Sequence, residues 1–598
     1  MSYRTLKACI NDLRHTRQLI EFDGEVDPYL ELAAVQRRLY AAESPAVLFT
    51  KPKNCRFPML ANLFGTEKRV EYIFRNGIEP LRKAMEFASE LPPKFSLKEI
   101  PSLLKSFYYS RYKHTSTLRK PPVLQNRITL DQLPQLVSWQ EDGGAYLTLP
   151  QVYTEDPEHP GIGRSNLGMY RIQISGNDYV PNEEAGLHYQ IHRGIASHHA
   201  KALALGKPLS VKIFIGGAPC MTLAAIMPLP ENVSEILFAG ILGQHRIPMI
   251  NNTGHCLIQE LMGIYAEADF CITGTLDTEE KTEGPFGDHL GYYSLAHKFP
   301  VLKVHSVYHR NDAIFPFTVV GHPPQEDTQF GKFIHNLVGN TVSKTIPGVR
   351  AVHAIDEAGV HPLLLAIGRE SYLPLDPSRR AAELHTLAHS LLGFGQLSLA
   401  KYLFLAAEGD DSNLSVYDVS RFLQHVLRRV DWKHDVHFIT KTTADTLDYT
   451  GGELNRGSKF FVSVSGKPRR KLAEVLPESL FAKNPRLAMP GVLCAEEIDW
   501  KRTFPEEIPL IVLVDDSTEA ASSLRNFLWT TFTKSDPASD ISGVGEFIEN
   551  KHWGCTGSLV INAKRKPHHP PELVELPEIA RRAEEIVEKI CIRSKSRA

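Results

Sequence analysis

The feature of this sequence that most constrains its fold is a series of short apolar runs between residues 145 and 320. They are rich in β-branched and aromatic residues and are bounded by glycine or proline: YLTLPQVYT, MYRIQISG, SVKIFIGG, LFAGILG, ADFCITGTL and VLKVHSVYH. Such runs are typical of strands separated by turns. We therefore expect a β-rich central region, interrupted by one helix at 187–204.

One of these expected strands directs an arginine away from the core. In MYRIQIS, alternate side chains point to opposite faces, so Tyr170, Ile172 and Ile174 share one face while Met169 and Arg171 share the other. The first set is apolar and is expected to face the core. Arg171 is then free to face a site.

The regions on both sides of the β-rich part mix helical and strand patterns. Before it we expect a helix at 6–20, a strand at 46–50 and a helix at 70–87, followed by a proline-rich and basic boundary between 88 and 135. After it, helices are expected around 379–393 and in DVSRFLQHVLRRV, and strands in VHFITK, IPLIVLVDD and SLVINA. The tail at 571–592 reads as a charged amphipathic helix.

Length and composition limit the class of protein. A chain of 598 residues is too long for one core, and roughly three to five domains are expected. With 67 basic and 69 acidic residues, the net charge of −2 gives no global attraction for nucleic acid or an anionic membrane. The eight cysteines include no C-x-x-C pair and suit a reducing cytoplasm.

Neither a signal peptide nor a membrane span is indicated. The N-terminus carries charges every few residues, and no window reaches the roughly 18 apolar residues that a span needs. We expect a soluble, cytoplasmic protein, and a peripheral membrane contact stays open.

The sequence does not match several familiar nucleotide-binding and zinc-binding motifs. GGELNRGSK has the glycine spacing of a phosphate loop but the wrong order of serine and lysine, and GIGRSNLG lacks the third glycine of a dinucleotide fingerprint. No HExxH and no Cys/His zinc spacing occurs. The aspartates that end IPLIVLVDD are better read as a helix cap at Asp516 or Ser517 than as a site.

The stretch T-E-G-P-F-G-D-H-L-G-Y-Y-S at 282–294 places two acids on a segment that its glycines and proline keep out of regular structure. The simple interpretation is a surface turn with solvated acids. The alternative is a site, because Phe286 is of a type usually buried and the flanking strands look apolar. If Glu283 and Asp288 are held partly dry, a raised pKa would let an acid donate a proton near neutral pH.

A second set of residues, Asn166, His188 and Glu235, is scattered over the β-rich region. Taken singly, each has a structural interpretation: an amide that caps a turn, an imidazole that bonds a carbonyl, and a carboxylate that faces water. Taken together, their donor atoms would suit Mn²⁺ or Mg²⁺. Spacing alone does not decide between these.

These residues lie in motifs that resemble a known family. E-G-P-F-G-D-H-x-G-Y-Y, N-x-G-M-Y-R-I-Q, H-R-G, M-P-L-P-E-x-x-S-E and V-V-G-H-P-P-Q-E-D occur in order along the chain. Together they resemble the UbiD family of reversible decarboxylases, which use prenylated FMN. The C-terminal stretch, with NFLWTTFTKSDPASDI and KHWGCTGSLVINAKRKPHHPP, is similar to a longer branch associated with menaquinone biosynthesis, which acts on a dihydroxynaphthoate.

The resemblance implies roles for particular residues. Arg171, Glu283 and Asp288 match the catalytic network, with Asp288 as proton donor. Asn166, His188 and Glu235 match the ligands of a divalent metal, Mn²⁺ or Mg²⁺, that bridges to the flavin phosphate, and K⁺ is a further candidate ion. The residues expected to bind the cofactor are Asn166, Met169, Tyr170, Arg171, His188, His192, Arg193, Glu235 and Lys401.

The fold implied is α/β (α+β). It comprises an N-terminal α/β domain at 1–125, a central split β-barrel flavin-binding domain at 126–325, a C-terminal α/β domain with a linker helix at 326–480, and an additional α/β segment with a tail helix at 481–598. The family also implies a homo-oligomer, either a dimer or a hexamer, and a flavin prenyltransferase of UbiX type that supplies the cofactor.

Three other functions stay open from the sequence. Within the family, the alternative is a decarboxylase of 4-hydroxybenzoate type, including its polyprenyl form. Outside it, the alternatives are a non-catalytic flavin-binding scaffold and a metal-dependent hydrolase that uses Asn166, His188, Glu235 and Asp288.

Overall fold

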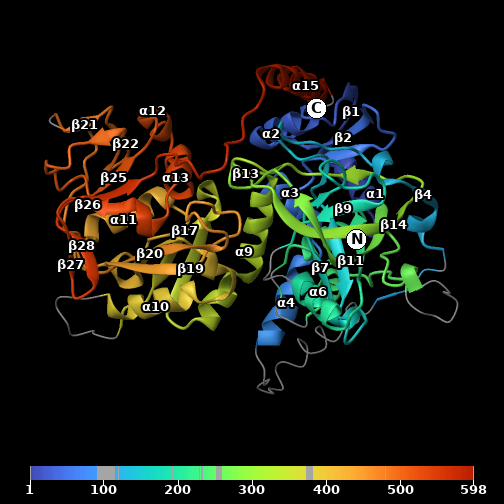
Figure 1. The fold of residues 1–598 in the computed structure, drawn as a ribbon, viewed down its shortest axis with the longest axis horizontal. Helices are drawn as coiled ribbons and strands as arrows, with labels where there is room; N and C mark the ends of the chain where they lie inside the picture. The colour runs from blue at the N-terminus through green and yellow to red at the C-terminus, as the bar shows by residue number, and fades with distance from the viewer. Residues whose placement is uncertain are drawn as a thin grey trace.

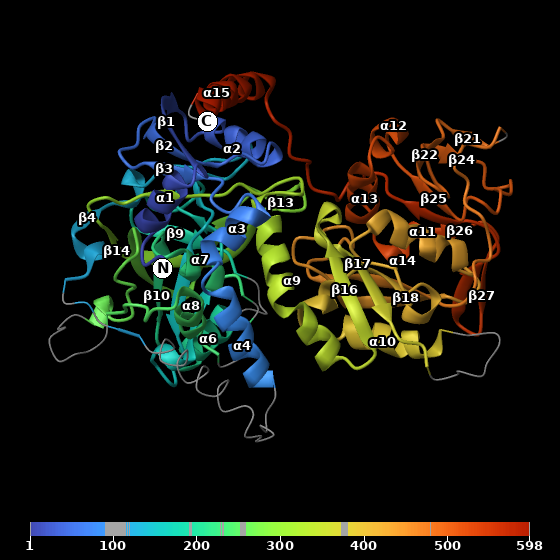
Figure 2. The same ribbon diagram turned by 180° about the vertical axis from the view of Figure 1, so that it is seen from behind.

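The chain forms two halves with a long helix between them (Figures 1 and 2). The computed structural model describes residues 2–89, 115–116, 118, 120–189, 194–227, 229, 233–250, 259–371, 381–478 and 480–596. One half holds the N-terminal and central sheets, and the other holds the C-terminal sheets. Helix α9 (Glu326–Thr345) lies between the halves.

The N-terminal layer is a four-stranded sheet with the order β1-β2-β3-β15. Its first three strands come from the N-terminus, and the last comes from beyond the central region: β1 (Leu19–Val26), β2 (Ala46–Pro52), β3 (Met59–Ala61) and β15 (Phe315–Pro316). Its helices are α1 (Leu6–His15), α2 (Glu31–Ala41), α3 (Glu67–Phe74) and α4 (Ile78–Ser89). The chain therefore returns to its first sheet after building the central one.

Two helix predictions in this region need correction. The helix expected at 6–20 ends at His15, because Leu19 and Ile20 already belong to β1. The helix expected at 70–87 is two helices, and the side chain of Thr66 caps the first by accepting a hydrogen bond from the Arg69 amide. The apolar periodicity continues across the break at 75–77, so it could not reveal it.

The central region is a nine-stranded sheet. Its strands are β4 (Asn126–Ile128), β5 (Tyr146–Leu147), β6 (Gln151–Glu155), β7 (Ser165–Gly168), β8 (Ile172–Gln173), β9 (Glu184–Leu187), β10 (Leu209–Ile215), β11 (Phe270–Glu283) and β14 (His297–His309). The long pair β11 and β14 is antiparallel and runs from Phe270 opposite His309 to Glu283 opposite His297. The expected β-rich region is confirmed.

The sheet is an open path rather than a closed barrel. The order runs β5-β8-β9-β14-β11-β10-β6-β7, and within the described residues no ladder joins β5 to β7. The α/β fold class is therefore confirmed, but the split barrel has no closing strand pair.

LFAGILG, expected as a strand, is part of helix α8 (Glu235–Gly243), since Ser234 and Glu235 start a helix that is apolar on nearly every side. The helix expected at 187–204 is α6 (Gly194–Ala204) in its described part, and Leu187 ends β9. A short helix, α7 (Pro219–Ala224), lies between β10 and α8.

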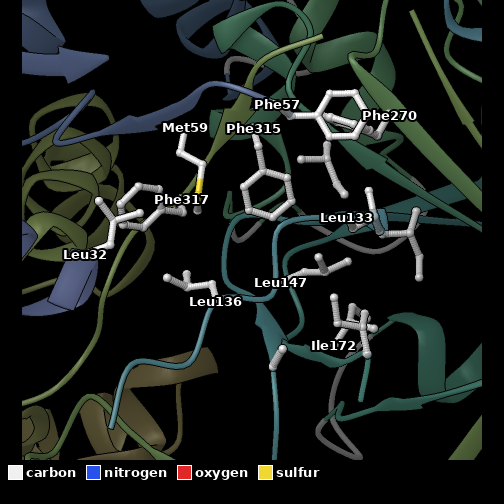
Figure 3. Packing of buried hydrophobic residues seen from close by; sticks show 14 of the residues in the cluster. Leu32, Phe57, Met59, Leu133, Leu136, Leu147, Ile172, Phe270, Phe315 and Phe317 are labelled. Atoms are coloured by element: carbon white, nitrogen blue, oxygen red, sulfur yellow. The ribbon is translucent and has the colours of Figure 1, made fainter. Parts of the chain in front are cut away.

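A continuous core joins the N-terminal and central sheets. Figure 3 shows Phe317 from the returning segment beside Leu32 and Met59 of the N-terminal layer, and Ile172 of the central sheet lies further along the same cluster. The burial of aromatic and branched side chains at such a junction is the main source of its stability. This core fixes β8, and therefore the residue that precedes it, relative to both sheets.

The C-terminal half contains two five-stranded sheets. The first has the order β16-β17-β18-β20-β19, with β16 (Val349–Ile355), β17 (Val360–Gly368), β18 (Tyr402–Ala407), β19 (Val436–Thr443) and β20 (Arg456–Val464). Helices α10 (Ala382–Leu392) and α11 (Val419–Arg429) pack against it. The second has the order β22-β23-β25-β29-β26, with β22 (Arg486–Met489), β23 (Val492–Ala495), β25 (Leu510–Leu513), β26 (Ile541–Gly543) and β29 (Leu559–Asn562).

The two sheets share one hydrophobic core. Phe532 of α13 (Leu524–Thr533) lies edge-on to Tyr402 of the first sheet, with ring centroids 5.0 Å apart. The smaller elements of this half are α12 (Ser517–Ala520), α14 (Pro537–Asp540), and the two-stranded sheets of β21 (Ala482–Lys483) with β24 (Glu497–Ile498) and of β27 (Glu546–Glu549) with β28 (His552–Cys555). As predicted, Asp516 caps a helix, accepting hydrogen bonds from the amides of Thr518 and Glu519.

The tail crosses back to the first half. Helix α15 (Pro577–Ser596) lies beside α2 and β1, in the other half of the molecule from the sheets that precede it (Figure 1). Its Ala583, Ile586 and Ile590 join the core of the N-terminal layer. The predicted amphipathic tail helix is confirmed from residue 577 onward. Within the described residues, no helix combines the length and the apolar content needed to cross a membrane.

Candidate active site

The buried neighbours of Arg171 determine on which face of the strand its side chain lies. Tyr170, Ile172 and Ile174 on either side of it are buried in the main core, as the alternation predicts. The Arg171 side chain emerges on the opposite face and is only 9% exposed. A guanidinium buried to this degree needs partners for its N–H groups, because an unpaired buried charge is very costly.

The acidic stretch supplies those partners. Glu283 ends β11, and the chain then turns at Gly284, whose φ of +90° favours glycine. The Gly284 amide donates to the Gln173 side chain at 3.0 Å. Glu283 is fully buried and Asp288 is 8% exposed. The interpretation as a solvated surface turn is therefore wrong.

The three groups form one ion cluster. Arg171 donates from Nε and Nη2 to the two carboxylate oxygens of Glu283 at 2.9 and 2.7 Å, and from Nη1 to Asp288 Oδ2 at 2.5 Å. Its Nη2 also donates to Ser294 Oγ at 2.9 Å. These contacts use four of the five N–H donors of a guanidinium and leave one on Nη1. The ring of Phe286 lies under the guanidinium, 4.7 Å from Arg171 Cζ.

The charges in this cluster keep both acids ionised. Burial by itself would raise the pKa of Glu283, but the charge of Arg171 and the hydrogen bonds from His188 and Arg171 lower it to about 2. Burial likewise opposes ionisation of Asp288, yet His289 and Arg171 hold its pKa well below the usual range. The expected raised pKa is therefore wrong for this arrangement: an adjacent cation outweighs desolvation.

His289 is a site residue that sequence reasoning missed. Its Nδ1 lies 2.9 Å from Asp288 Oδ1, and its backbone amide donates to the same oxygen at 2.7 Å. Burial would lower the pKa of His289, but Asp288 raises it to about 9. The available signal was its position directly after Asp288 in the motif. Asp288 therefore lies between two cations, Arg171 and His289.

The proposed metal ligands fall into two groups. Glu235, at the first turn of α8, accepts a hydrogen bond from the Leu167 amide at 2.9 Å, so its carboxylate lies beside the β7 residue Asn166. His188 instead lies at the ion cluster, with Nδ1 3.1 Å from Glu283 Oε2 and its ring 4.0 Å from that of Phe299. Its pKa is lowered by burial and by Arg171. Among the described residues, no three His, Cys, Asp or Glu side chains are arranged to hold a metal ion.

The remaining cofactor candidates have mixed outcomes. His192 and Arg193 lie outside the described residues. Met169 is half-buried, and its amide donates to the Ala225 carbonyl at 2.9 Å; the Tyr170 hydroxyl lies 3.5 Å from Asn166 Nδ2. Lys401 is buried and pairs with Asp448 at 2.7 Å and Thr450 at 3.0 Å.

The Lys401 contacts brace a loop that reaches the site from the C-terminal half. Between Asp448 and Thr450, the Tyr449 hydroxyl accepts a hydrogen bond from the Leu295 amide at 3.1 Å. Its ring stacks near His297, with centroids 6.2 Å apart. Burial, and more weakly the charge of Asp288, raises the pKa of Tyr449 to about 12. The C-terminal half therefore forms one wall of the site.

A large cleft lies between the halves. Its volume is about 1960 Å³, and its lining includes Trp139, Ile226, His322, Thr328 and Asp356 but none of Arg171, Glu283 or Asp288. Asp327, which precedes the lining residue Thr328, raises the pKa of His289 through its charge. The volume of the cleft would admit a tricyclic ring system.

Comparison with known proteins decides the family. Three models match in order: the 3-octaprenyl-4-hydroxybenzoate carboxy-lyase N-terminal domain over residues 10–88, the Rift-related domain over 114–323 and the C-terminal domain over 328–463. The chain belongs to the UbiD family. It is therefore a decarboxylase of the UbiD class that acts on aromatic acids.

Relatives from chlamydiae match over nearly the whole length. A protein of Chlamydia trachomatis named only as uncharacterized is 37% identical over 589 residues, covering 95% of this chain and 96% of its own. A protein of Chlamydia pneumoniae named as a component of 4-hydroxybenzoate decarboxylase is 36% identical over 582 residues, covering 95% of both chains. These UbiD relatives therefore share the segment beyond residue 463.

Solved structures share the fold. The closed form of vanillic acid decarboxylase from Sedimentibacter hydroxybenzoicus has a TM-score of 0.62 at 22% identity, covering 80% of this chain and 96% of its own. The UbiD-class enzyme HmfF from Pelotomaculum thermopropionicum, in complex with FMN, has a TM-score of 0.60 at 19% identity, covering 79% and 97%. About a fifth of this UbiD chain is additional to them.

Replacement of Arg171 by methionine tests the ion cluster. The variant leaves two buried carboxylates without their cation, and we expect the free energy of unfolding to fall by about 3–5 kcal/mol at pH 8. Without Arg171, burial raises the folded-state pKa of Glu283 above its unfolded value, so this acid takes up a proton as the pH falls. The deficit relative to the wild type should therefore shrink between pH 8 and pH 5. Denaturant titrations at pH 8 and pH 5 measure the free energies of unfolding of the variant and the wild type. An equal deficit at the two pH values would contradict the account.

Proposed function

We propose that this chain catalyses non-oxidative, reversible removal of CO2 from an aromatic carboxylic acid with prenylated FMN, and that the acid is a dihydroxynaphthoate of menaquinone biosynthesis. The observation that carries the proposal is the buried Arg171–Glu283–Asp288 cluster in a chain of this family. Support for the substrate is the resemblance of the C-terminal stretch to the longer branch of the family.

The reaction explains why a cofactor is needed. Loss of CO2 from an aromatic ring leaves an electron pair in the ring plane, where the π system does not delocalise it. General acid catalysis contributes about 10²–10⁴-fold, whereas enzymes reach roughly 10⁶–10¹⁷-fold. Prenylated FMN, when bound, supplies the electron sink that no side chain offers.

The chain's own residues would hold the cofactor's phosphate and its metal near α8. Asn166 and Glu235 offer an amide oxygen and a carboxylate, which suit Mn²⁺ or Mg²⁺. Glu235 fits this role because burial raises its pKa to about 7, so that a bound cation would stabilise its ionised form. Gly194 leaves the necessary space, since a Cβ there would lie 2.3 Å from Asn166 Oδ1. His188 fits less directly, since its Nδ1 is engaged by Glu283.

Arg171 would orient the substrate, and Asp288 would transfer the proton. The remaining Nη1 donor of Arg171 can bind the substrate carboxylate. The negative charge of that carboxylate favours the protonated form of Asp288, which takes its proton from solvent. Asp288 then delivers the proton to the ring carbon that CO2 has left. Glu283 keeps Arg171 in place and balances its charge.

The second candidate is a decarboxylase of 4-hydroxybenzoate type. It is favoured by the name of the Chlamydia pneumoniae relative and by the names of the family models. The hydrolase alternative is set aside, because the chain belongs to a family of carboxy-lyases. The scaffold alternative is disfavoured by the intact cluster of Arg171, Glu283 and Asp288.

We also propose a cytoplasmic homo-oligomer, a dimer or a hexamer, that receives its cofactor from a flavin prenyltransferase of UbiX type. All seven cysteines in the described part of the chain are free, which suits a reducing compartment. Among the solved structures that share the fold is an evolved dimeric form of HmfF, which supports a dimer as one of the two states. The domain boundaries at 125, 325 and 480 are retained as part of this proposal.

The proposal is tested by co-expressing the chain with a flavin prenyltransferase. We expect a protein with flavin absorbance that releases CO2 from a dihydroxynaphthoate faster than from 4-hydroxybenzoate or its prenylated form. Chain expressed without the prenyltransferase is the control and should be inactive. Faster release from the hydroxybenzoates would favour the second candidate, and a flavin-bound protein inert toward every acid would contradict the proposal.

Replacement of Asp288 by asparagine tests the proton donor. The variant keeps nearly the same volume and the Arg171 contact but cannot donate a carboxylic proton. We expect kcat to fall at least about 100-fold, with flavin absorbance unchanged. Asp277, an acid of β11 with an exposed side chain, provides the control variant Asp277→Asn. Normal turnover of the Asp288 variant would refute this role.

Replacement of Glu235 by alanine tests the metal ligand. We expect less metal and less flavin to remain bound after dialysis, because the carboxylate that neutralises the metal is lost. The exposed Glu549 provides the control variant, Glu549→Ala. Metal analysis and the absorbance spectrum are the measurements, and full retention of both would remove Glu235 from the site.

A further inference from the structure

The segment between Asp288 and Ser294 is held by a part of the chain that the family models do not reach. The C-terminal match ends at residue 463, whereas the contacts described below come from residues 529–573. Both ends of segment 288–294 contact Arg171, Asp288 through its carboxylate and Ser294 through its hydroxyl. Whatever fixes this segment therefore fixes the geometry of the ion cluster.

Trp529 of α13 makes the central contact. Its Nε1 donates to the Leu290 carbonyl at 2.8 Å, and its ring stacks on Tyr292 with centroids 5.2 Å apart and planes 12° from parallel. Gly291 allows this approach: its φ is +88°, and a Cβ there would lie 3.1 Å from Trp529 Nε1. Leu290, Tyr292 and Trp529 form a buried cluster of their own.

A second contact fixes the hydroxyl of Tyr292. That hydroxyl lies 3.0 Å from Thr533 Oγ1, one turn further along α13. Thr533 Oγ1 in turn donates to the Trp529 carbonyl at 2.6 Å. Tyr292 is thus held through both its ring and its hydroxyl, and Asp288 is tied to it because the Asp288 amide donates to the Tyr292 carbonyl at 3.0 Å.

A third contact comes from residues 571–573, which we call the strap. The strap runs beside segment 288–294 like an added strand: the Tyr293 amide donates to the Pro571 carbonyl at 3.0 Å, and the Leu573 amide donates to the Gly291 carbonyl at 3.1 Å. Lys534 pairs with Glu572 at 2.7 Å and links the strap to the end of α13.

The strap is anchored on the far side as well. Glu575, two residues beyond it, pairs with Arg37 at 2.5 Å and with Arg38 at 2.8 Å, both on α2. Helix α15 then packs into the N-terminal core and forms an ion pair between Arg582 and Glu31. Figures 1 and 2 show this path as a single trace that leaves the C-terminal half and ends against α2. The strap is therefore anchored to both halves.

We propose that Trp529 and the strap are positioning elements of the active site: they hold segment 288–294 so that the Asp288 carboxylate faces both Arg171 and the reacting carbon. This inference rests on the proposed function for its chemistry. The physical reason is that a displacement of about 1 Å at a reacting group can cost about 100-fold in rate. A segment that turns at a glycine with positive φ, Gly291, does not keep such a position unaided.

The C-terminal addition then has a defined task. In the simple alternative, residues 481–598 only add a domain that packs on its neighbours, and their substitution would affect stability alone. The positioning role and the purely structural role predict different effects of losing Trp529. If Trp529 positions Asp288, its loss should change turnover far more than substrate binding, because Arg171 and the cleft remain in place.

The test uses the cofactor-loaded, full-length enzyme with Trp529→Phe and Tyr292→Phe. The first variant keeps an aromatic ring beside Tyr292 but removes the donor to Leu290, and the second removes only the hydroxyl that meets Thr533. We expect kcat to fall about 10- to 100-fold in Trp529→Phe and less in Tyr292→Phe, with KM and flavin content within about twofold of the wild type. Trp553→Phe, in β28 at the far edge of the C-terminal half, is the matched control and should leave kcat unchanged.

A second readout does not depend on activity. Hydrogen exchange of the peptide covering 288–294, measured by mass spectrometry, should accelerate at least about tenfold in Trp529→Phe and stay unchanged in Trp553→Phe. Exchange in β11, which pairs with β10 and β14 in the central sheet, reports whether the variant is folded. If the wild type decarboxylates no aromatic acid, the proposed function fails, while the exchange result still decides whether this segment is held by Trp529.

Three outcomes would overturn the inference. One is unchanged exchange at 288–294 in Trp529→Phe. Another is faster exchange with kcat unchanged, which would show that the segment is held for stability alone. A fall in kcat accompanied by an equal rise in KM would also contradict it, since that pattern belongs to substrate binding.

Discussion

The site depends on one buried guanidinium. Arg171 bonds both oxygens of Glu283, one oxygen of Asp288 and the hydroxyl of Ser294, and these three partners come from a segment more than a hundred residues later in the chain. A positive charge at this depth is tolerated only with such partners. The same contacts determine the charge of the acids, because Arg171 keeps Glu283 and Asp288 ionised against the effect of burial.

Each part of the fold contributes one constraint on this cluster. The core around Ile172 fixes the backbone at Arg171, and the β11–β14 pair brings Glu283 to it. The C-terminal half adds Tyr449 on a loop braced by Lys401 and Asp448. The additional segment supplies Trp529. Because distant segments hold each side chain of the site, these side chains keep fixed positions. Proton delivery to a single ring carbon requires such fixed positions.

Sequence alone predicted the local features that follow from periodicity and motif. The β-rich centre, the orientation of Arg171, the tail helix and the cap at Asp516 are confirmed because each depends on neighbouring residues. LFAGILG was misread, since an apolar run of that length suits a strand or a buried helix equally well. The pKa of Asp288 was misjudged because the contact with Arg171 is tertiary and because the adjacent His289 was not recognised as a partner. Trp529 could not be found from the sequence, because nothing local to it refers to residue 290.

The most direct test of the central claim follows the proton. The aromatic product is incubated with the cofactor-loaded enzyme in D2O. Asp288 should then catalyse exchange of one hydrogen of the product, the one on the ring carbon that carried the carboxyl group. The account predicts one deuterium at that carbon with the wild type and at least about 100-fold slower labelling with Asp288→Asn. Labelling at an equal rate in the variant would show that another group handles the proton, and that the Arg171–Glu283–Asp288 cluster is not the reactive centre.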